Sequence, residues 1–148
     1  MACQSSRRLT LLGLMTTMAT NESHGKFEDV LTAAKPNLRP ICEAIRSRIA
    51  SLHREFVLVV WPKQKIASFG VGKKKMTEHY AYIAVQRSHV NLGFYHGTSL
   101  ADPTGVLEGT GRKLRHVKLN DVASANNAAV TALLSQAIAE RMRSAAEP

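Results

Sequence analysis

Aromatic and imidazole side chains recur at alternate positions in three strand-like segments of the sequence. Residues 80–86, 89–96 and 114–119 alternate apolar and polar side chains, and in a β-strand the side chains of one parity share one face. The apolar parity predicts the core face, and the opposite face then collects Tyr80, Tyr82, His89, Asn91, Tyr95 and His116. Such a face can hold a ring by stacking and an anion by hydrogen bonding. The alternative is an ordinary exposed sheet face whose Tyr and His residues only pair across strands.

The glycine-rich segment 107–116 is a second candidate for chemistry. Gly109 and Gly111 allow backbone N–H groups to approach an anion, and the guanidinium groups of Arg112 and Arg115 can each fork onto an oxyanion. We therefore predict a ligand-binding site in which Arg112, Arg115 and His116 adjoin the polar sheet face. A tight turn that needs positive φ explains the glycines equally well, so both interpretations stay open.

The six histidines and two cysteines do not have the spacing of a metal site. Neither H-E-x-x-H nor H-x-H occurs, and few carboxylates lie near the histidines. No set of nucleophile, base and acid is apparent either: Ser88 precedes His89, but adjacent strand residues point to opposite faces. We predict no metal, no cofactor and no enzymatic activity, and we interpret Cys42 as a buried, inert thiol.

Positive charge is concentrated in the middle of the chain. The net charge is +9, from 20 basic and 11 acidic residues, and residues 61–120 carry ten basic groups against three acidic groups, or +7. Such a field attracts phosphates, nucleic acid or other anions. A purely solubilising charge is the alternative interpretation.

Apolar periodicity predicts the elements that position these residues. Helical spacing favours a short helix over about 26–35, a second helix that begins near Pro40, with a buried stripe of Ile41, Ile45, Ile49 and Leu52, and a C-terminal helix capped by Asn126 or Asn127. A weaker strand pattern covers 66–71. The strands are bracketed by helices, which predicts an α+β fold: an antiparallel sheet of about four to five strands with N- and C-terminal helices packed on one face.

The ends of the chain are expected to lie outside this domain. A length of 148 residues fits one domain, which we place at 23–143, with a tail at 144–148. Residues 1–22 are interpreted as a disordered or wrongly assigned extension, and a targeting segment is the alternative. The sequence has no run of about 20 apolar residues, so we expect no membrane partner and a cytoplasmic location.

Several runs resemble the YdhG-like family, a domain of unknown function. They are HVNLGFYHG at 89–97, LEGTG at 107–111 and LRHVK at 114–118, with VWP at 60–62 and SFGVG at 68–72 upstream. The resemblance spans about Leu38 to Met142. It implies a compact α+β domain similar to frataxin-type folds, and it implies that residues 52–61 are helical. Some members are described as frataxin-like iron chaperones. The β-branched composition of 54–61 favours a strand instead, and both structures stay open.

The sequence therefore supports three functional hypotheses. The leading one is a non-catalytic module, monomeric or homodimeric, that binds a small anionic or ring-bearing ligand on the open sheet face and the 107–116 loop. The first alternative is a frataxin-like iron chaperone, which rests on the family resemblance. The second is a nucleic-acid-binding module, which rests on the basic middle region and on tyrosines that could stack on bases.

Overall fold

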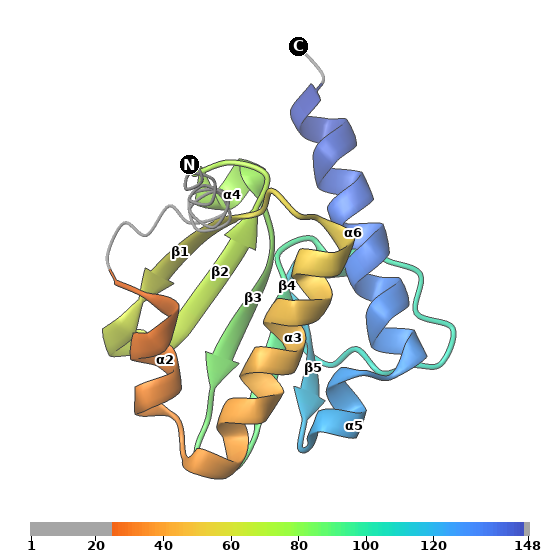
Figure 1. Ribbon diagram of the computed structural model, residues 1–148. Coiled ribbons are helices and arrows are strands. Elements are labelled where there is room, and N and C mark those ends of the chain that lie inside the picture. The colour runs from red at the N-terminus through yellow and green to blue at the C-terminus, as the bar shows by residue number, and fades with distance from the viewer. Residues whose placement is uncertain (1–24, 147–148) are drawn as a thin grey trace, which may run out of the picture.

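A meander of five antiparallel strands forms the centre of the molecule (Figure 1). The structure is a computed structural model and describes residues 25–146, apart from the side chains of Lys75 and Met76. Each strand pairs with the next along the chain, so no crossover helix is needed. The strands are β1 (Val57–Trp61), β2 (Ile66–Gly70), β3 (His79–Val85), β4 (Val90–Phe94) and β5 (Arg115–Leu119).

Three longer helices lie on one face of this sheet. Figure 1 shows α2 (Phe27–Ala33), α3 (Arg39–Leu52) and α6 (Ala128–Ala146) in front of the strands. Helices α4 (Lys75–Glu78) and α5 (Val122–Ala125) are single turns, and short 3-10 turns occupy Pro36–Leu38, Pro62–Gln64 and Gly97–Ser99. The arrangement confirms the predicted α+β fold with an antiparallel sheet.

The core fills the space between the helices and the sheet. On α3, the predicted stripe of Ile41, Ile45 and Ile49 is fully buried, whereas Leu52, at the end of the helix, is 36% exposed. Cys42 lies in the same core, and burial raises the pKa of its thiol to about 11. The thiol is therefore protonated at neutral pH, which agrees with the inert role predicted for it.

Residues 57–61 form the edge strand β1, so the helix that the family resemblance implied for this segment is wrong. Helix α3 ends at Leu52, where the N–H of His53 still donates to the carbonyl of Ile49. The run of Val and Leu side chains then favours extended backbone. A 3-10 turn at Pro62–Gln64, followed by Lys65 with φ of 59°, reverses the chain into β2.

A β-bulge at the start of β3 overturns the predicted position of Tyr80. Phe69 pairs with Ala81 but the next residue, Gly70, pairs with His79, so Tyr80 is an extra residue in β3. Such a bulge breaks the strict alternation of faces. Tyr80 is buried in the core on the helix side, where its hydroxyl lies 2.9 Å from Nδ1 of His53. The predicted alternation is correct from Ala81 onward and wrong at Tyr80.

The chain ends are only partly covered by the structure. The interpretation of residues 1–22 falls outside the described residues, as does the last part of the predicted tail. Helix α6 continues to Ala146. Its first turn is capped by Asn127, whose Oδ1 accepts a hydrogen bond from the N–H of Ala129. Within residues 25–146, every helix is too short or too polar to cross a bilayer.

Candidate functional site

The strand register places one row of side chains across the face that the long helices leave uncovered. Ser68 on β2 lies opposite Tyr82 on β3, Tyr82 opposite Gly93 on β4, and Gly93 opposite His116 on β5. Gly93 has no side chain, and the Tyr82 ring occupies the space where a Cβ would otherwise lie. The glycine therefore lets the tyrosine ring lie flat against the sheet.

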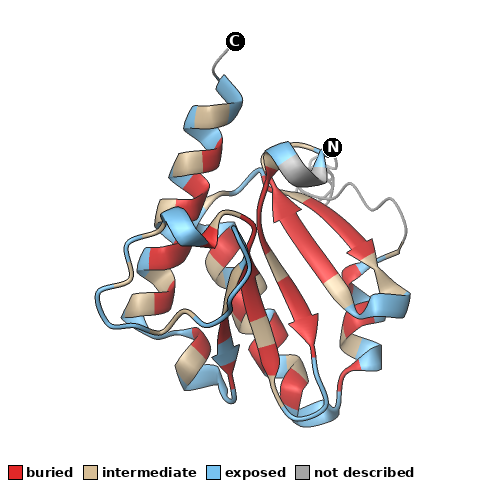
Figure 2. Ribbon diagram, turned by 180° about the vertical axis from the view of Figure 1, so that it is seen from behind, coloured by how far each residue is buried: buried red, intermediate tan, exposed pale blue. Residues whose placement is uncertain are grey.

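A cleft opens between this face and the loop at Gly111–Leu114. Its volume is about 810 Å³, which lies within the range of small-molecule sites. Aromatic and aliphatic side chains make most of its walls, namely Trp61, Ile66, Tyr82, Tyr95 and Leu114. Gln64, Arg112 and Lys113 add polar groups. Figure 2 looks onto this side and shows that the strands are largely buried even where no long helix covers them.

The aromatic walls of the cleft contact one another. The ring centroids of Tyr82 and Tyr95 lie 5.1 Å apart with the planes tilted by 53°, a spacing typical of favourable ring pairs. Burial raises the pKa of both phenols, that of Tyr95 to about 12. Both tyrosines are therefore neutral at physiological pH and carry no negative charge that would repel an anion.

A buried hydrogen-bond chain supports Tyr95 from behind. The Ser68 hydroxyl lies 2.8 Å from the Tyr95 hydroxyl and 2.5 Å from Nδ1 of His79. Ser68 and His79 are both 0% exposed, so the chain is shielded from solvent. The bulge at Tyr80 is what turns His79 toward this face. Because the buried hydroxyls bind one another, the Tyr95 ring is held in one position.

Arg115 holds the loop that covers the cleft. Its Nη1 donates to the carbonyl oxygens of Gly111 and Leu114, at 2.5 and 2.7 Å. The stem of Arg115 passes so close to Gly97 that a Cβ there would overlap it. Arg115 was predicted to bind a ligand, which stays a prediction, and its Nη1 is used for these two hydrogen bonds within the protein. The structure gives it a positioning role.

The remaining predicted residues lie around the cleft without lining it. Asn91 is on the open face opposite Ala84 and Lys118, and its Oδ1 is buried without a hydrogen-bond partner in the described structure. His116 lies on the same face, 3.9 Å from the Glu108 carboxylate. His89 is half-buried at the β3–β4 hairpin, where its carbonyl accepts from the N–H of Gln86. Of the eight predicted residues, the structure brings Tyr82, Tyr95 and Arg112 together in the cleft.

The sequence reasoning named three of the nine residues that line the cleft as site residues. Trp61 and Ile66 are a cross-strand pair of the β1–β2 hairpin and share the face of Ser68. Alternation over 57–61 would have placed Trp61 there, had the segment been taken as a strand. Leu114, which is 46% exposed, lies within the 107–116 loop that was predicted to bind the ligand, although it was not singled out as a site residue.

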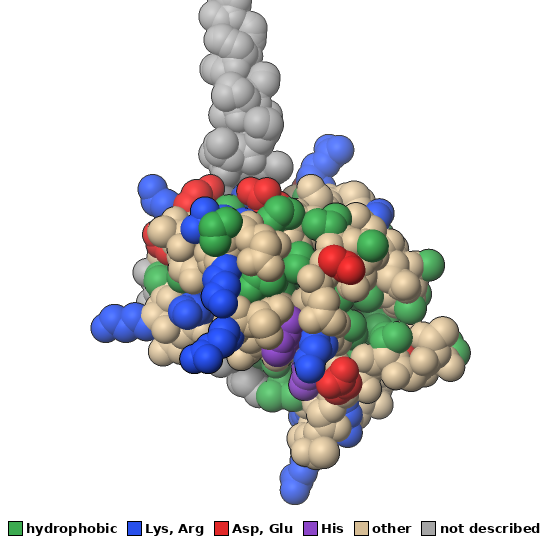
Figure 3. All heavy atoms as spheres, turned by 90° about the horizontal axis from the view of Figure 1, so that it is seen from below, with side chains coloured by type: hydrophobic (Ala, Val, Ile, Leu, Met, Phe, Trp, Pro, Cys, Tyr) green, Lys and Arg blue, Asp and Glu red, His purple; other side chains and the backbone are tan. Residues whose placement is uncertain are grey.

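Charge around the molecule is mixed, with basic side chains prominent. Figure 3 shows Lys and Arg side chains among hydrophobic ones on the face seen from below, with histidines between them. Lys63, Lys65, Arg112 and Lys113 are exposed, and each lies in or next to a segment that lines the cleft. No group of three or more His, Cys, Asp or Glu side chains within residues 25–146 is arranged to hold a metal ion.

The chain was compared with known protein families, curated proteins and solved structures. Neither the family models, nor the curated proteins, nor the solved structures contain a match to the chain.

Proposed function

We propose that the protein binds a small, ring-bearing anion in the cleft between the open sheet face and the loop at Gly111–Leu114. The observation that carries this proposal is the pairing of an aromatic cleft with a cationic rim. Trp61 and Tyr82, which are both partly exposed, offer flat apolar surfaces, and Arg112 and Lys113 bring positive charge to the same opening.

The walls favour a ring over an aliphatic chain. Tyr82 and Tyr95 are held against the sheet by Gly93 and by the Ser68–His79 hydrogen bonds. Because these side chains are already ordered, a ligand that stacks on them does not have to immobilise them. A planar ring gains the most from such a surface, since aromatic pairs add about 0.5–1.5 kcal/mol beyond the area they bury.

The rim favours an acid over a neutral or basic compound. The cleft contains no carboxylate among its lining residues, so Arg112 and Lys113 attract an anion without an internal competitor. A guanidinium group also matches the two oxygens of a carboxylate or phosphate. The ring would lie on Trp61 and Tyr82, and the acid group would face the loop.

A calorimetric screen tests the proposal. Aromatic carboxylates and nucleoside monophosphates are compared with inorganic phosphate and with uncharged aromatic amides. We expect saturable binding only for compounds that carry both a ring and an anionic group. Arg112→Ala should weaken that binding about tenfold, because a hydrogen bond to a charged group is lost. Arg143→Ala, at an exposed arginine of α6 outside the cleft, is the matched control and should bind like the wild type.

Two results would contradict the proposal. One is binding of phosphate alone with the same affinity as the ring-bearing anions, since the aromatic walls would then contribute nothing. The other is equal weakening by Arg112→Ala and Arg143→Ala, which indicates a general charge effect. A nucleic-acid module would instead bind oligonucleotides, with an affinity that falls steeply with salt, by a logarithmic slope of about 0.7 per phosphate.

A further inference from the structure

The loop that borders the cleft turns most of its carbonyl groups toward the protein. The carbonyl oxygens of Gly111 and Leu114 accept hydrogen bonds from Nη1 of Arg115, at 2.5 and 2.7 Å. The carbonyl oxygen of Lys113 accepts from the backbone N–H of Thr98, at 3.2 Å. Three of the loop's four carbonyl groups are therefore bound by the segments that hold the loop in place.

The backbone N–H groups of the same loop are unused. Within the described part of the chain, none of its four N–H groups has a hydrogen-bond partner. The N–H and C=O of a trans peptide group point in opposite directions. Because the carbonyl of Gly111 faces Arg115, the N–H of Arg112 points away from Arg115. By the same geometry, the N–H of Leu114 points away from Thr98. The free side of the loop thus offers donors and few acceptors.

A surface of this kind suits a phosphate group better than a carboxylate. All four loop residues line the cleft, and the side chains of Arg112 and Lys113 add two cationic groups. Successive backbone N–H groups make anion-binding concavities in many phosphate sites. A phosphate ester has three strong acceptor oxygens and close to two negative charges at neutral pH. It can therefore accept from more of these donors than the two oxygens of a carboxylate can.

A free carboxamide lies on the hairpin side of the cleft. Gln64 lines the cleft, and its side chain has no hydrogen-bond partner among the described residues. The turn that carries it is fixed at both ends. The N–H of Lys65 donates to the carbonyl of Pro62 at 3.0 Å, and the N–H of Val85 donates to the carbonyl of Lys65 at 3.1 Å. A carboxamide offers a donor beside an acceptor, and it pairs with a ring edge that carries both, as nucleobases do.

The volume of the cleft exceeds what a single ring needs. A cavity of about 150 Å³ is enough to enclose benzene, whereas the cleft measures about 810 Å³. A single-ring acid would leave most of this space to water. A ring joined to a sugar and a phosphate fills more of it and can reach from the hairpin to the loop.

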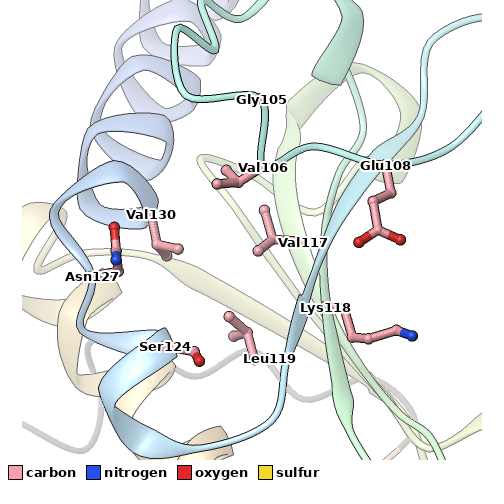
Figure 4. A pocket seen from close by; sticks show the side chains of 9 residues that line it. All are labelled: Gly105, Val106, Glu108, Val117, Lys118, Leu119, Ser124, Asn127 and Val130. Atoms are coloured by element: carbon pink, nitrogen blue, oxygen red, sulfur yellow. The ribbon is translucent and has the colours of Figure 1, made fainter.

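A second pocket, between β5 and the α5–α6 segment, does not suit such a ligand. Its volume is about 300 Å³, and none of the residues that line it is aromatic. Figure 4 shows the Glu108 carboxylate on the same side of β5 as Lys118, with Val117 and Leu119 on the other side. A carboxylate at the pocket repels a phosphate. The cleft is therefore the better site for a ring-bearing phosphate.

We propose that the ligand of the cleft is a free nucleoside monophosphate. This inference rests on the proposed function and names the class of compound that fits its site. The phosphate binds the free N–H groups of the loop and the Arg112 side chain. The base stacks on Trp61 and Tyr82, and Gln64 pairs with its edge. Among the residues that line the cleft, only Arg112 and Lys113 are basic, which suits one phosphate group and not a strand with one charge per nucleotide.

Matched adenosine compounds test the two polar ends of the ligand. Adenosine 5′-monophosphate is titrated by calorimetry beside adenosine 5′-carboxylate, which lacks the phosphate, and beside purine riboside 5′-monophosphate, which lacks the amino donor of the base. We expect the first compound to bind about ten times more tightly than either of the others. In NMR spectra it should also shift the amide signals of Arg112 and Leu114, because their N–H groups donate to the phosphate.

A pair of glutamine variants tests the contact with the base. Gln64→Met removes the carboxamide at similar side-chain length. It should make the adenosine and purine riboside monophosphates bind equally, while the preference for phosphate over carboxylate remains. Gln86→Met, at an exposed glutamine of the β3–β4 hairpin outside the cleft, is the matched control and should bind like the wild type.

The possible failures separate this inference from the proposed function. Equal affinity for adenosine 5′-monophosphate and p-nitrobenzoate would overturn the nucleotide assignment and leave the binding of a ring-bearing anion in place. Unchanged amide signals in the loop, or a wild-type preference in Gln64→Met, would overturn the assignment too. So would tighter binding of single-stranded oligoadenylate, with an affinity that falls steeply with salt. Absence of binding by every ring-bearing anion would overturn the proposed function and this inference with it.

Discussion

Ser68 links the cleft to the interior of the sheet through a single hydroxyl. That hydroxyl bonds both the Tyr95 hydroxyl and Nδ1 of His79, and all three residues are buried. Polar groups are expensive to bury unless they are paired. The three residues therefore depend on one another, and the position of the Tyr95 ring in the cleft depends on Ser68.

Replacing this hydroxyl should destabilise the protein. Ser68→Ala leaves two buried polar groups short of a partner, so we expect a loss of about 1–3 kcal/mol in the free energy of unfolding, measured by urea denaturation. Ser51→Ala is the matched control, because the Ser51 hydroxyl bonds the carbonyl of Arg48 at an exposed site. It should change stability by less than about 0.5 kcal/mol. Equal effects of the two substitutions would show that the buried chain has no structural role.

At the scale of elements, the cleft depends on how the loop at Gly111–Leu114 is held over the sheet. Arg115 belongs to β5 and bonds two carbonyls of that loop. The strand thus holds its own preceding loop beside the cleft through two hydrogen bonds.

Loss of these two hydrogen bonds should loosen the loop and spare the sheet. In Arg115→Met, we expect faster hydrogen exchange at residues 111–114, unchanged protection in β2 and β3, and weaker binding of the ring-bearing anion. Arg112→Met is the comparison, because Arg112 lines the cleft but makes no hydrogen bond to the loop within the described residues. It should weaken binding without faster exchange. Unchanged exchange in Arg115→Met would refute the positioning role.

The sequence predicted the elements better than their contacts. Alternation and helical spacing located β2 to β5, α3 and α6, because burial of one face leaves a regular pattern. The pattern failed at Tyr80, where a bulge adds a residue that no local signal marks. It also left Trp61 unassigned, since the β-branched run at 57–61 competed with a helix implied by resemblance. Contacts across the fold, such as Arg115 to Gly111, have no sequence period at all.

For the molecule as a whole, the buried phenols link stability to alkaline pH. The pKa of Tyr80 is raised by burial, and that of Tyr95 is raised to about 12, whereas in the unfolded chain both titrate near pH 10. Between these values the folded state binds more protons than the unfolded state. The free energy of unfolding therefore does not depend on these phenols below about pH 10, and it declines as the pH rises toward 12.

Urea denaturation across this pH range checks the linkage. We expect the free energy of unfolding to fall with pH above about 10, and to fall less steeply in Tyr95→Phe, which removes one of the raised groups. The hydroxyl-free variant will be less stable at neutral pH, so the slopes are compared and not the absolute values. Parallel curves for the variant and the wild type would contradict the assignment.

Fluorescence of Trp61 tests the binding cleft most directly, because it is the only tryptophan in the chain and it lines the cleft. The protein is titrated with p-nitrobenzoate, whose ring quenches indole emission on contact, and with the uncharged p-nitrobenzamide. We predict saturable quenching by the carboxylate, with an affinity reduced about tenfold in Arg112→Ala. Quenching by p-nitrobenzoate that rises linearly with its concentration, as for free tryptophan in solution, would contradict a ligand site between the sheet and the loop.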